Sequence, residues 1–154
     1  MKRAYVILNG YKVNNIGESE LCFFIQQADP YLPAAWKNSE GQYKPVGGAI
    51  EDGEDAILAV RRELEEENPG FFEVARLPGT KMLHVHTHQN LEFYSQTIDV
   101  GLVSWDKYKS SSKESAPVSM SLTRFKHLAV HSPGDFTPGM IEAMNKIIST
   151  YGKK

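Results

Sequence analysis

Short apolar runs separated by turn-forming residues dominate the first half of the chain. Ala4–Leu8 and Leu21–Gln27 are rich in β-branched and aromatic residues and end at polar turn formers, which predicts two strands. The prolines and glycine of Asp29–Gln42 predict an irregular surface loop. In Pro45–Gly53, a strand end is expected to pass into a glycine-rich turn.

The second half of the pattern begins with the clearest helix, Glu54–Asn68, which Pro69 and Gly70 end. Three further runs predict strands, the last two forming a hairpin through residues 88–90: Phe72–Leu77, Lys81–Thr87 and Leu91–Val103. The serine-rich Lys107–Pro117 predicts a mobile loop, and Met140–Tyr151 has apolar residues at helical spacing. This order predicts an α/β fold, with a mixed sheet between helices.

Composition excludes some function classes without choosing one. A length of 154 residues fits a single domain over 1–154, and a formal net charge of −2 gives no basic field for long nucleic acid. The one cysteine, Cys22, lies in an apolar run, which indicates a core residue and a reducing compartment. The N-terminal apolar run is too short for a signal peptide, and no membrane segment follows. We expect a cytoplasmic protein; whether it forms a homodimer stays open.

The predicted helix at 54–68 carries an acidic cluster. Glu63, Glu66 and Glu67 stand at i, i+3 and i+4, so they project within an arc of about 100°. A neighbouring apolar stripe is expected to face the core: Ile57, Val60 and Leu64. Each like-charge pair costs about 0.2–0.5 kcal/mol unless a cation lies between the acids, and a hard divalent ion suits their oxygens. The alternative is a solvated charged face, eased by neighbouring arginines.

A wider pattern favours the metal site over the solvated face. Seven positions match G-x5-E-x7-R-E-U-x-E-E-x-G-U, where U is apolar: Gly48, Glu54, Arg62, Glu63, Leu64, Glu66 and Glu67. In this the chain resembles the Nudix hydrolase family. The last two positions depart, because Pro69 and Gly70 stand where the family has glycine and an apolar residue. Since proline and glycine both end helices, we expect an altered helix exit with the site kept.

The resemblance implies a Nudix-type α/β/α sandwich and a hydrolase that cleaves the diphosphate bond of a small nucleotide. The substrate would be a nucleoside diphosphate linked to another moiety, such as a nucleoside triphosphate or a nucleotide sugar. Mg²⁺ would be the cofactor, with Mn²⁺ as a substitute, and its implied ligands are Gly48 (through its carbonyl), Glu63, Glu66 and Glu67. Glu63, or an acid from elsewhere, would deprotonate the attacking water. Arg62 and Glu54 would orient this set through a salt bridge.

Two alternatives belong to other classes. One is an inactive Nudix-like nucleotide-binding module. The retained motif residues Arg62, Glu63, Glu66 and Glu67 argue against this alternative. The other is the family's isomerase branch, which depends on a catalytic cysteine, whereas Cys22 is expected in the core. Downstream of the motif, Leu83–Thr87 contains neither the proline typical of ADP-ribose hydrolases nor the tyrosine typical of dinucleoside polyphosphate hydrolases.

Several weaker features accompany the motif. His84, His86 and His88 alternate along a predicted strand, so we expect them to share one face, as a polar surface or part of a substrate pocket. A zinc site is less favoured, because three positions on one straight strand rarely converge on a tetrahedral ion. Trp36 and Tyr43 could stack on a base or pack internally. Glu114 could act as an external base or be a solvated loop acid.

Overall fold

The computed structural model describes residues 2–28, 42–67, 82–98 and 115–151. In these ranges the elements are β1 (Arg3–Val13), β2 (Ser19–Ala28), β3 (Tyr43–Lys44), β4 (Val46–Ala49), α1 (Ala56–Glu67), β5 (Leu83–His88), β6 (Leu91–Thr97), β7 (Ser115–Ser121), α3 (Leu122–His131), a short 3₁₀ turn (Pro133–Asp135) and α4 (Met140–Tyr151). None of the described helices is long and apolar enough to cross a membrane.

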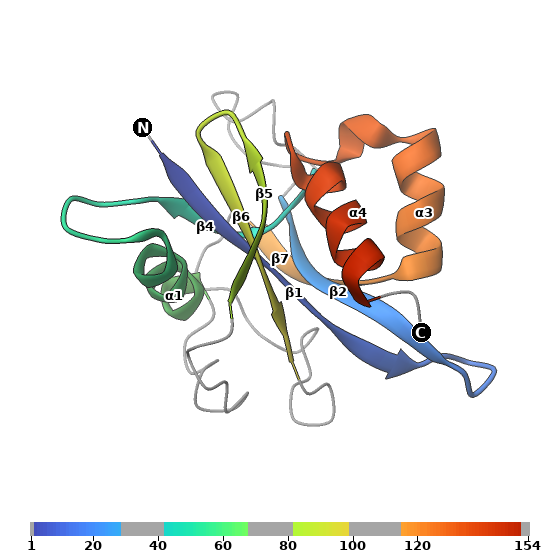
Figure 1. Ribbon diagram of the computed structural model, residues 1–154. Helices are drawn as coiled ribbons and strands as arrows, with labels where there is room; N and C mark the ends of the chain where they lie inside the picture. Colours follow the sequence, from blue (N-terminus) through green and yellow to red (C-terminus); the bar gives the residue numbers. More distant parts are fainter. Residues whose placement is uncertain (1, 29–41, 68–81, 99–114, 152–154) are drawn as a thin grey trace.

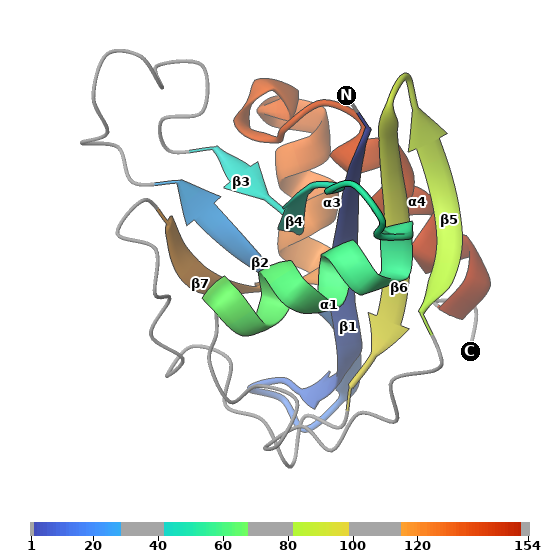
Figure 2. The same ribbon diagram turned by 90° about the vertical axis from the view of Figure 1, so that its left-hand side faces the viewer.

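The strands form one mixed sheet between helices. Its central order is β3-β2-β1-β6-β5, with β4 paired to β1 and β7 paired to β2. The β1–β6 pair is parallel, whereas the other strand pairs are antiparallel. Helix α1 covers one face, and α3 with α4 covers the other (Figures 1 and 2). The α/β/α sandwich predicted from the sequence is therefore confirmed.

Alternation along the strands divides the apolar residues between two cores. On β1, Val6 and Leu8 pack toward α1, whereas Ile7 packs toward α3 and α4. On β2, Phe24 joins the α1 core and Phe23 the other. Because successive side chains of a strand point to opposite faces, one central strand supplies both cores. The uninterrupted apolar runs of the sequence reflect a sheet that is buried on both sides.

The site is positioned where β1 and β2 separate. β2 pairs with the second half of β1, up to Leu8, and β4 pairs with the first half. Beyond this point β2 pairs with β3, so β3 and β4 lie between the two diverging strands. Gly47 makes the fit possible: its φ is +150°, and a Cβ there would overlap the Ala4 carbonyl oxygen. The close approach brings the next residue, Gly48, under α1.

Most described elements match the sequence predictions, with two differences. The strand at 21–27, the 88–90 hairpin turn, and the helices over 54–68 and 140–151 are confirmed with small shifts of their ends. The strand predicted at 4–8 is also confirmed, but it continues to Val13. Residues 115–117, predicted as loop, belong to β7, where pairing with β2 overrides their polar composition. Helix α3 was not predicted. The predicted Phe72–Leu77 strand, and the predicted loops at 29–41 and 107–114, lie outside the described residues.

Candidate functional site

Helix α1 presents its acids beside the sheet and not on its solvated back. Asp55 caps the helix, because its Oδ1 accepts the backbone N–H of Leu58 at 2.8 Å. Val60 and Leu64 are fully buried, as predicted. Ile57 was predicted to be buried too, but it is 36% exposed. At about 100° per residue, the sheet-facing direction lies between Val60 and Glu63, which leaves Ile57 at the margin.

Arg62 ties α1 to the turn that precedes it. Its Nε and Nη2 donate to the two carboxylate oxygens of Glu54 at 2.8 and 3.0 Å. Nη2 also donates to the Ala49 carbonyl oxygen at 3.1 Å, and Glu54 accepts the backbone N–H of Glu51 at 2.9 Å. A bidentate arginine–carboxylate pair fixes both orientation and distance. The end of β4, the turn and the middle of the helix are therefore held as one unit.

The Arg62–Glu54 pair is charged throughout the neutral range. The hydrogen bond from Arg62 lowers the pKa of the Glu54 carboxyl, and the backbone N–H of Glu51 lowers it further. In return, the hydrogen bond to Glu54 raises the pKa of the Arg62 guanidinium. Each partner stabilises the charged form of the other. The contact is an ion pair, as the family resemblance implies.

Glu63 lies between Arg62 and the backbone of Gly48. Arg62 Nη1 donates to Glu63 Oε1 at 3.1 Å, and the Glu63 side chain is only 19% exposed. A Cβ on Gly48 would lie 2.9 Å from the same oxygen, so the glycine leaves a space that any other residue would fill. Glu66 is more open, with 59% of its side chain exposed and Oε2 at 3.4 Å from Arg62 Nη1.

All five predicted metal-site and orienting positions with described side chains thus meet in one place. Glu54, Glu63 and Glu66 each contact Arg62, and Gly48 lies against Glu63. Glu67 ends α1, but its side chain lies outside the described part of the structure. Within that part, no three His, Cys, Asp or Glu side chains form a ready-made metal cage. The groups present are nevertheless hard oxygen donors, since the Glu63 carboxylate faces backbone that no side chain shields. This donor set fits Mg²⁺ or Mn²⁺ better than a softer metal.

The three histidines of β5 do not share a face, which corrects the sequence prediction. The register shifts between His84 and His86, so that His84 pairs with Tyr94 while His86 pairs with Phe93. Because Tyr94 and Phe93 are consecutive residues of β6, they point to opposite faces of the sheet. A β-bulge at Val85 has therefore turned His84 away from the other two.

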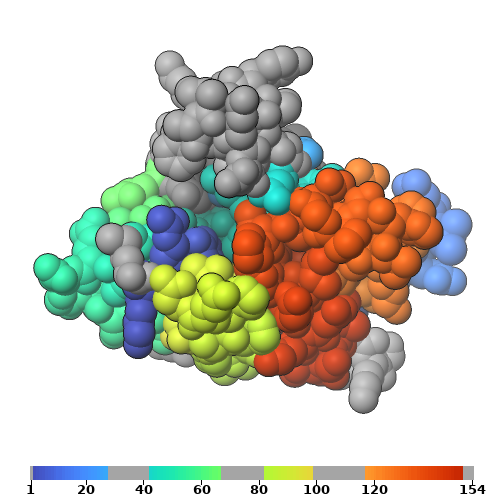
Figure 3. Space-filling model, turned by 90° about the horizontal axis from the view of Figure 1, so that it is seen from above, coloured from blue at the N-terminus to red at the C-terminus, as the bar shows by residue number. Residues whose placement is uncertain are grey.

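The separated histidines have different partners. His84 Nε2 lies 2.6 Å from Glu92 Oε2, on the α1 side, where Glu92 also lines a cleft of about 540 Å³ beside the β4–α1 turn. His86 Nδ1 lies 2.8 Å from Lys146 Nζ of α4, on the opposite side. Figure 3 shows the β5–β6 hairpin packed against α4. His84 therefore lies on the same side of the sheet as the candidate site, whereas His86 contacts α4 on the opposite side.

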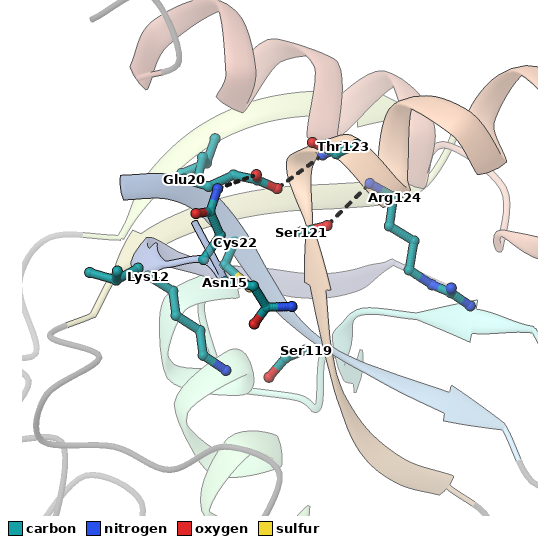
Figure 4. Close-up of a pocket in the computed structure, with 11 residues that line it drawn as sticks. Lys12, Asn15, Glu20, Cys22, Ser119, Ser121, Thr123 and Arg124 are labelled. Atoms are coloured by element: carbon teal, nitrogen blue, oxygen red, sulfur yellow. Dashed lines mark hydrogen bonds between the residues drawn. The ribbon is translucent and has the colours of Figure 1, made fainter. Parts of the chain in front are cut away.

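A further cavity, of about 460 Å³, lies where β1, β2 and β7 meet the start of α3. Lys12, Asn15 and Ser119 point into it (Figure 4). Glu20 is the single carboxylate among its described lining residues, and it accepts the backbone N–H of Thr123 at 3.3 Å. That hydrogen bond lowers the pKa of Glu20. Glu20 is hydrogen-bonded to the first turn of α3, and no second carboxylate lies beside it among these lining residues. This cavity therefore differs from the site at α1, where several carboxylates lie close together.

The remaining sequence candidates have simple outcomes. Tyr43 is buried and packs its ring against Phe136, with centroids 5.4 Å apart, so its packing role is the one observed. Cys22 is buried in the α1 core, as expected. Trp36 and Glu114 lie outside the described residues. The Asp55 cap and the Ala49 carbonyl were not singled out from the sequence; an acidic residue at the start of a helical run was the available signal for Asp55.

Comparison with solved structures identifies the fold. A mutT/nudix family protein from Listeria innocua superposes with a TM-score of 0.67 at 15% identity, covering 99% of this chain and 94% of that one. The Caenorhabditis elegans Ap4A hydrolase, in a binary complex, gives 0.61 at 16% identity and covers 99% and 100%. The NUDIX domain of Shewanella oneidensis NrtR, complexed with ADP ribose, gives 0.56 at 12% identity and covers 96% and 88%.

The chain therefore has the Nudix fold, as its motif implied. No protein-family model matches the sequence, and no curated protein matches it. At these identities the likeness establishes the fold, and the chemistry rests on the residues of the site.

Proposed function

We propose that this protein is a Mg²⁺-dependent hydrolase that cleaves the diphosphate bond of a nucleoside diphosphate linked to another moiety, such as a nucleoside triphosphate or a nucleotide sugar. One observation carries the proposal. The Glu63 carboxylate lies against the backbone of Gly48, where there is no side chain. Arg62, the residue before Glu63, donates two hydrogen bonds to the Glu54 carboxylate. These residues are ones that the motif names, and the chain has the Nudix fold, so both support the proposal.

Each residue has a role that follows from its contacts. Glu63 and Glu66, with the Gly48 carbonyl and Glu67, would hold the metal ion. When bound, Mg²⁺ supplies positive charge for the phosphoryl oxygens and lowers the pKa of a bound water. Glu63 would also accept the proton of the attacking water, unless an acid from elsewhere does so. Arg62 and Glu54 are positioning residues, because their hydrogen bonds satisfy each other and the backbone.

The ligands of structural neighbours support a nucleotide substrate. One neighbour is an Ap4A hydrolase and another was solved with ADP ribose, and both compounds contain a nucleoside joined to a phosphate anhydride. The isomerase alternative loses support, because Cys22 is 5% exposed within the α1 core. The inactive binding module is the alternative that activity measurements decide.

Phosphate release from a panel of nucleoside triphosphates and nucleotide sugars, with Mg²⁺ and with excess chelator, tests the proposal. We expect hydrolysis that chelation abolishes. Glu63→Gln and Glu66→Gln should each lower turnover at least about 10²-fold, because each removes charge that acts mainly in the transition state. Glu65→Gln is the matched control, since Glu65 is exposed on the same turn but points away, and should keep its activity. Near-normal turnover in a Glu66→Gln, Glu67→Gln double variant would overturn the assignment.

A further inference from the structure

Helix α3 carries two histidines one turn apart, on the side of the sheet opposite α1 (Figure 1). His127 and His131 stand at i and i+4, which makes their side chains neighbours on the helix surface. The centroids of their imidazole rings are 4.4 Å apart, and the ring planes are inclined by 40°. Both residues are exposed. The two rings therefore form a close pair that a solute can reach.

Contacts with the rest of the protein do not account for this pair. Within residues 2–28, 42–67, 82–98 and 115–151, the histidines that form hydrogen bonds or ion pairs through their rings are His84 and His86. A neutral imidazole carries a lone pair on one ring nitrogen, and this lone pair binds metal ions. His127 and His131 can thus offer two such nitrogens side by side, with no side-chain partner to be displaced.

The position of the pair along α3 also favours a cation. The helix ends at His131, so the two histidines lie on its last two turns. The unpaired carbonyl groups at a helix C-terminus carry partial negative charge, which stabilises nearby positive charge. A metal ion held between the two rings would lie beside this end of the helix.

We propose that His127 and His131 bind one divalent transition-metal ion of the class that imidazole prefers, which includes Cu²⁺, Ni²⁺ and Zn²⁺. Two histidines at i and i+4 of a helix can share one zinc ion, because this spacing directs both rings to the same point. Water completes the coordination, since the described part of the chain groups no three His, Cys, Asp or Glu side chains. Mg²⁺ prefers oxygen ligands and does not compete. The site is separate from α1, so this inference does not depend on the proposed hydrolase activity.

Calorimetric titration of the tag-free protein with Ni²⁺ tests the inference. An excess of Mg²⁺ keeps the α1 carboxylates occupied or in competition with Ni²⁺ throughout. We expect the wild type to bind one equivalent of Ni²⁺. His131→Gln should weaken this binding at least about 10-fold, because losing even an outer-shell partner of a metal ligand costs that much.

The matched control exchanges two exposed neighbours, Lys126→His with His127→Lys, so that composition and net charge stay the same. The histidines then stand five residues apart, about 140° around the helix, and cannot share an ion. We expect the same loss of affinity. Ni²⁺ should raise the melting temperature of the wild type but not of the exchange variant, while the metal-free proteins melt alike. If the wild type binds no Ni²⁺, or if either variant keeps the wild-type affinity, the inference is wrong.

Discussion

At Gly48, the missing side chain lets β4 lie against the Glu63 carboxylate. A Cβ there would stand 2.9 Å from Oε1 and 3.1 Å from Cδ of Glu63. The atoms in the way are the end of a side chain and not backbone, so Gly48→Ala should fold with little loss of stability. The displaced carboxylate should lower kcat by about 10-fold or more, because catalytic groups tolerate little misplacement.

Steady-state kinetics and a thermal melt of Gly48→Ala check this prediction. Gly134→Ala is the control, since a Cβ at that position meets nothing within 4 Å. It should change neither kcat nor the melting temperature appreciably. A Gly48→Ala variant with wild-type kcat would show that the contact between β4 and Glu63 is not needed for turnover.

His86 should make stability depend on pH in the weakly acidic range. Burial lowers its pKa, and the nearby Lys146 ammonium lowers it further. The folded protein therefore binds this proton less readily than the unfolded chain, whose histidines titrate near pH 6.5. The contribution of His86 to the free energy of unfolding is therefore fully present above about pH 6.5. The free energy of unfolding decreases as the pH falls below that value. Urea titrations from pH 7.5 to 5.5 should show this fall, and a smaller one for His86→Gln.

The control for His86 is His131→Gln, a change on the exposed surface of α3 that should keep the wild-type pH dependence. Carboxyls with lowered pKa, such as Glu20 and Glu54, lose their stabilising effect only below about pH 4.5, so they do not interfere. Equal pH dependence in wild type and His86→Gln would mean that the imidazole titrates alike in both states.

Individual residues were predicted from the sequence when their chemistry depends on local spacing. Glu63 stands out because helical spacing groups it with Glu66 and Glu67, and Arg62 because the family motif includes it. The sequence predicts His84 and His86 on one face because side chains alternate along a regular strand, whereas the bulge between them depends on pairing with β6. Gln26 lies near the end of the strand predicted at Leu21–Gln27. Only the packing shows that its carboxamide is buried and unpaired.

Among the elements, α1 and the turn before it act as one unit through Arg62. Lysine cannot reproduce the planar fork that binds Glu54 through two nitrogens and also reaches the Ala49 carbonyl. Arg62→Lys should therefore reduce kcat/KM by about 10–100-fold, as is typical when a partner that orients a metal ligand is lost.

Apparent Mg²⁺ affinity, measured from the metal dependence of the rate, should weaken in Arg62→Lys as well. Arg61→Lys is the control on the neighbouring position and should behave as wild type. If Arg62→Lys lost activity through general unfolding, its helical circular dichroism would fall too. We expect that signal to be retained.

The elements predicted correctly are those with a strong period of their own. Helix α1 and helix α4 each show apolar residues at helical spacing, and the β5–β6 hairpin has a polar turn between alternating runs. Helix α3 is capped by Ser121 and buries Phe125, but it is only ten residues long. Its apolar pattern is therefore too short to predict a helix from the sequence. β7 is polar along much of its length, because its strand character comes from pairing with β2 along seven residues.

For the whole molecule, the sheet couples two cores that lie on opposite sides. Val6 and Ile7 are neighbours on β1, yet one packs beneath α1 and the other beneath α4. Neither core can lose its packing without loosening the strand that both share. We therefore expect one cooperative unfolding transition, in which events at the α1 carboxylates affect the stability of α4.

Metal binding is the way to test this coupling. Without metal, Glu66 is repelled by Glu63 but paired with Arg62, and Glu66→Gln weakens both interactions. These effects are of similar size, so the variant should melt close to the wild-type temperature. If Mg²⁺ binds the folded state only, as proposed, then Mg²⁺ at about 100 times its dissociation constant should raise the wild-type melting temperature by about 5–10 °C. The variant should gain much less. Hydrogen exchange should show added protection in α4 as well as α1, because both exchange through the same global opening. Protection confined to α1 would mean that the two cores unfold separately.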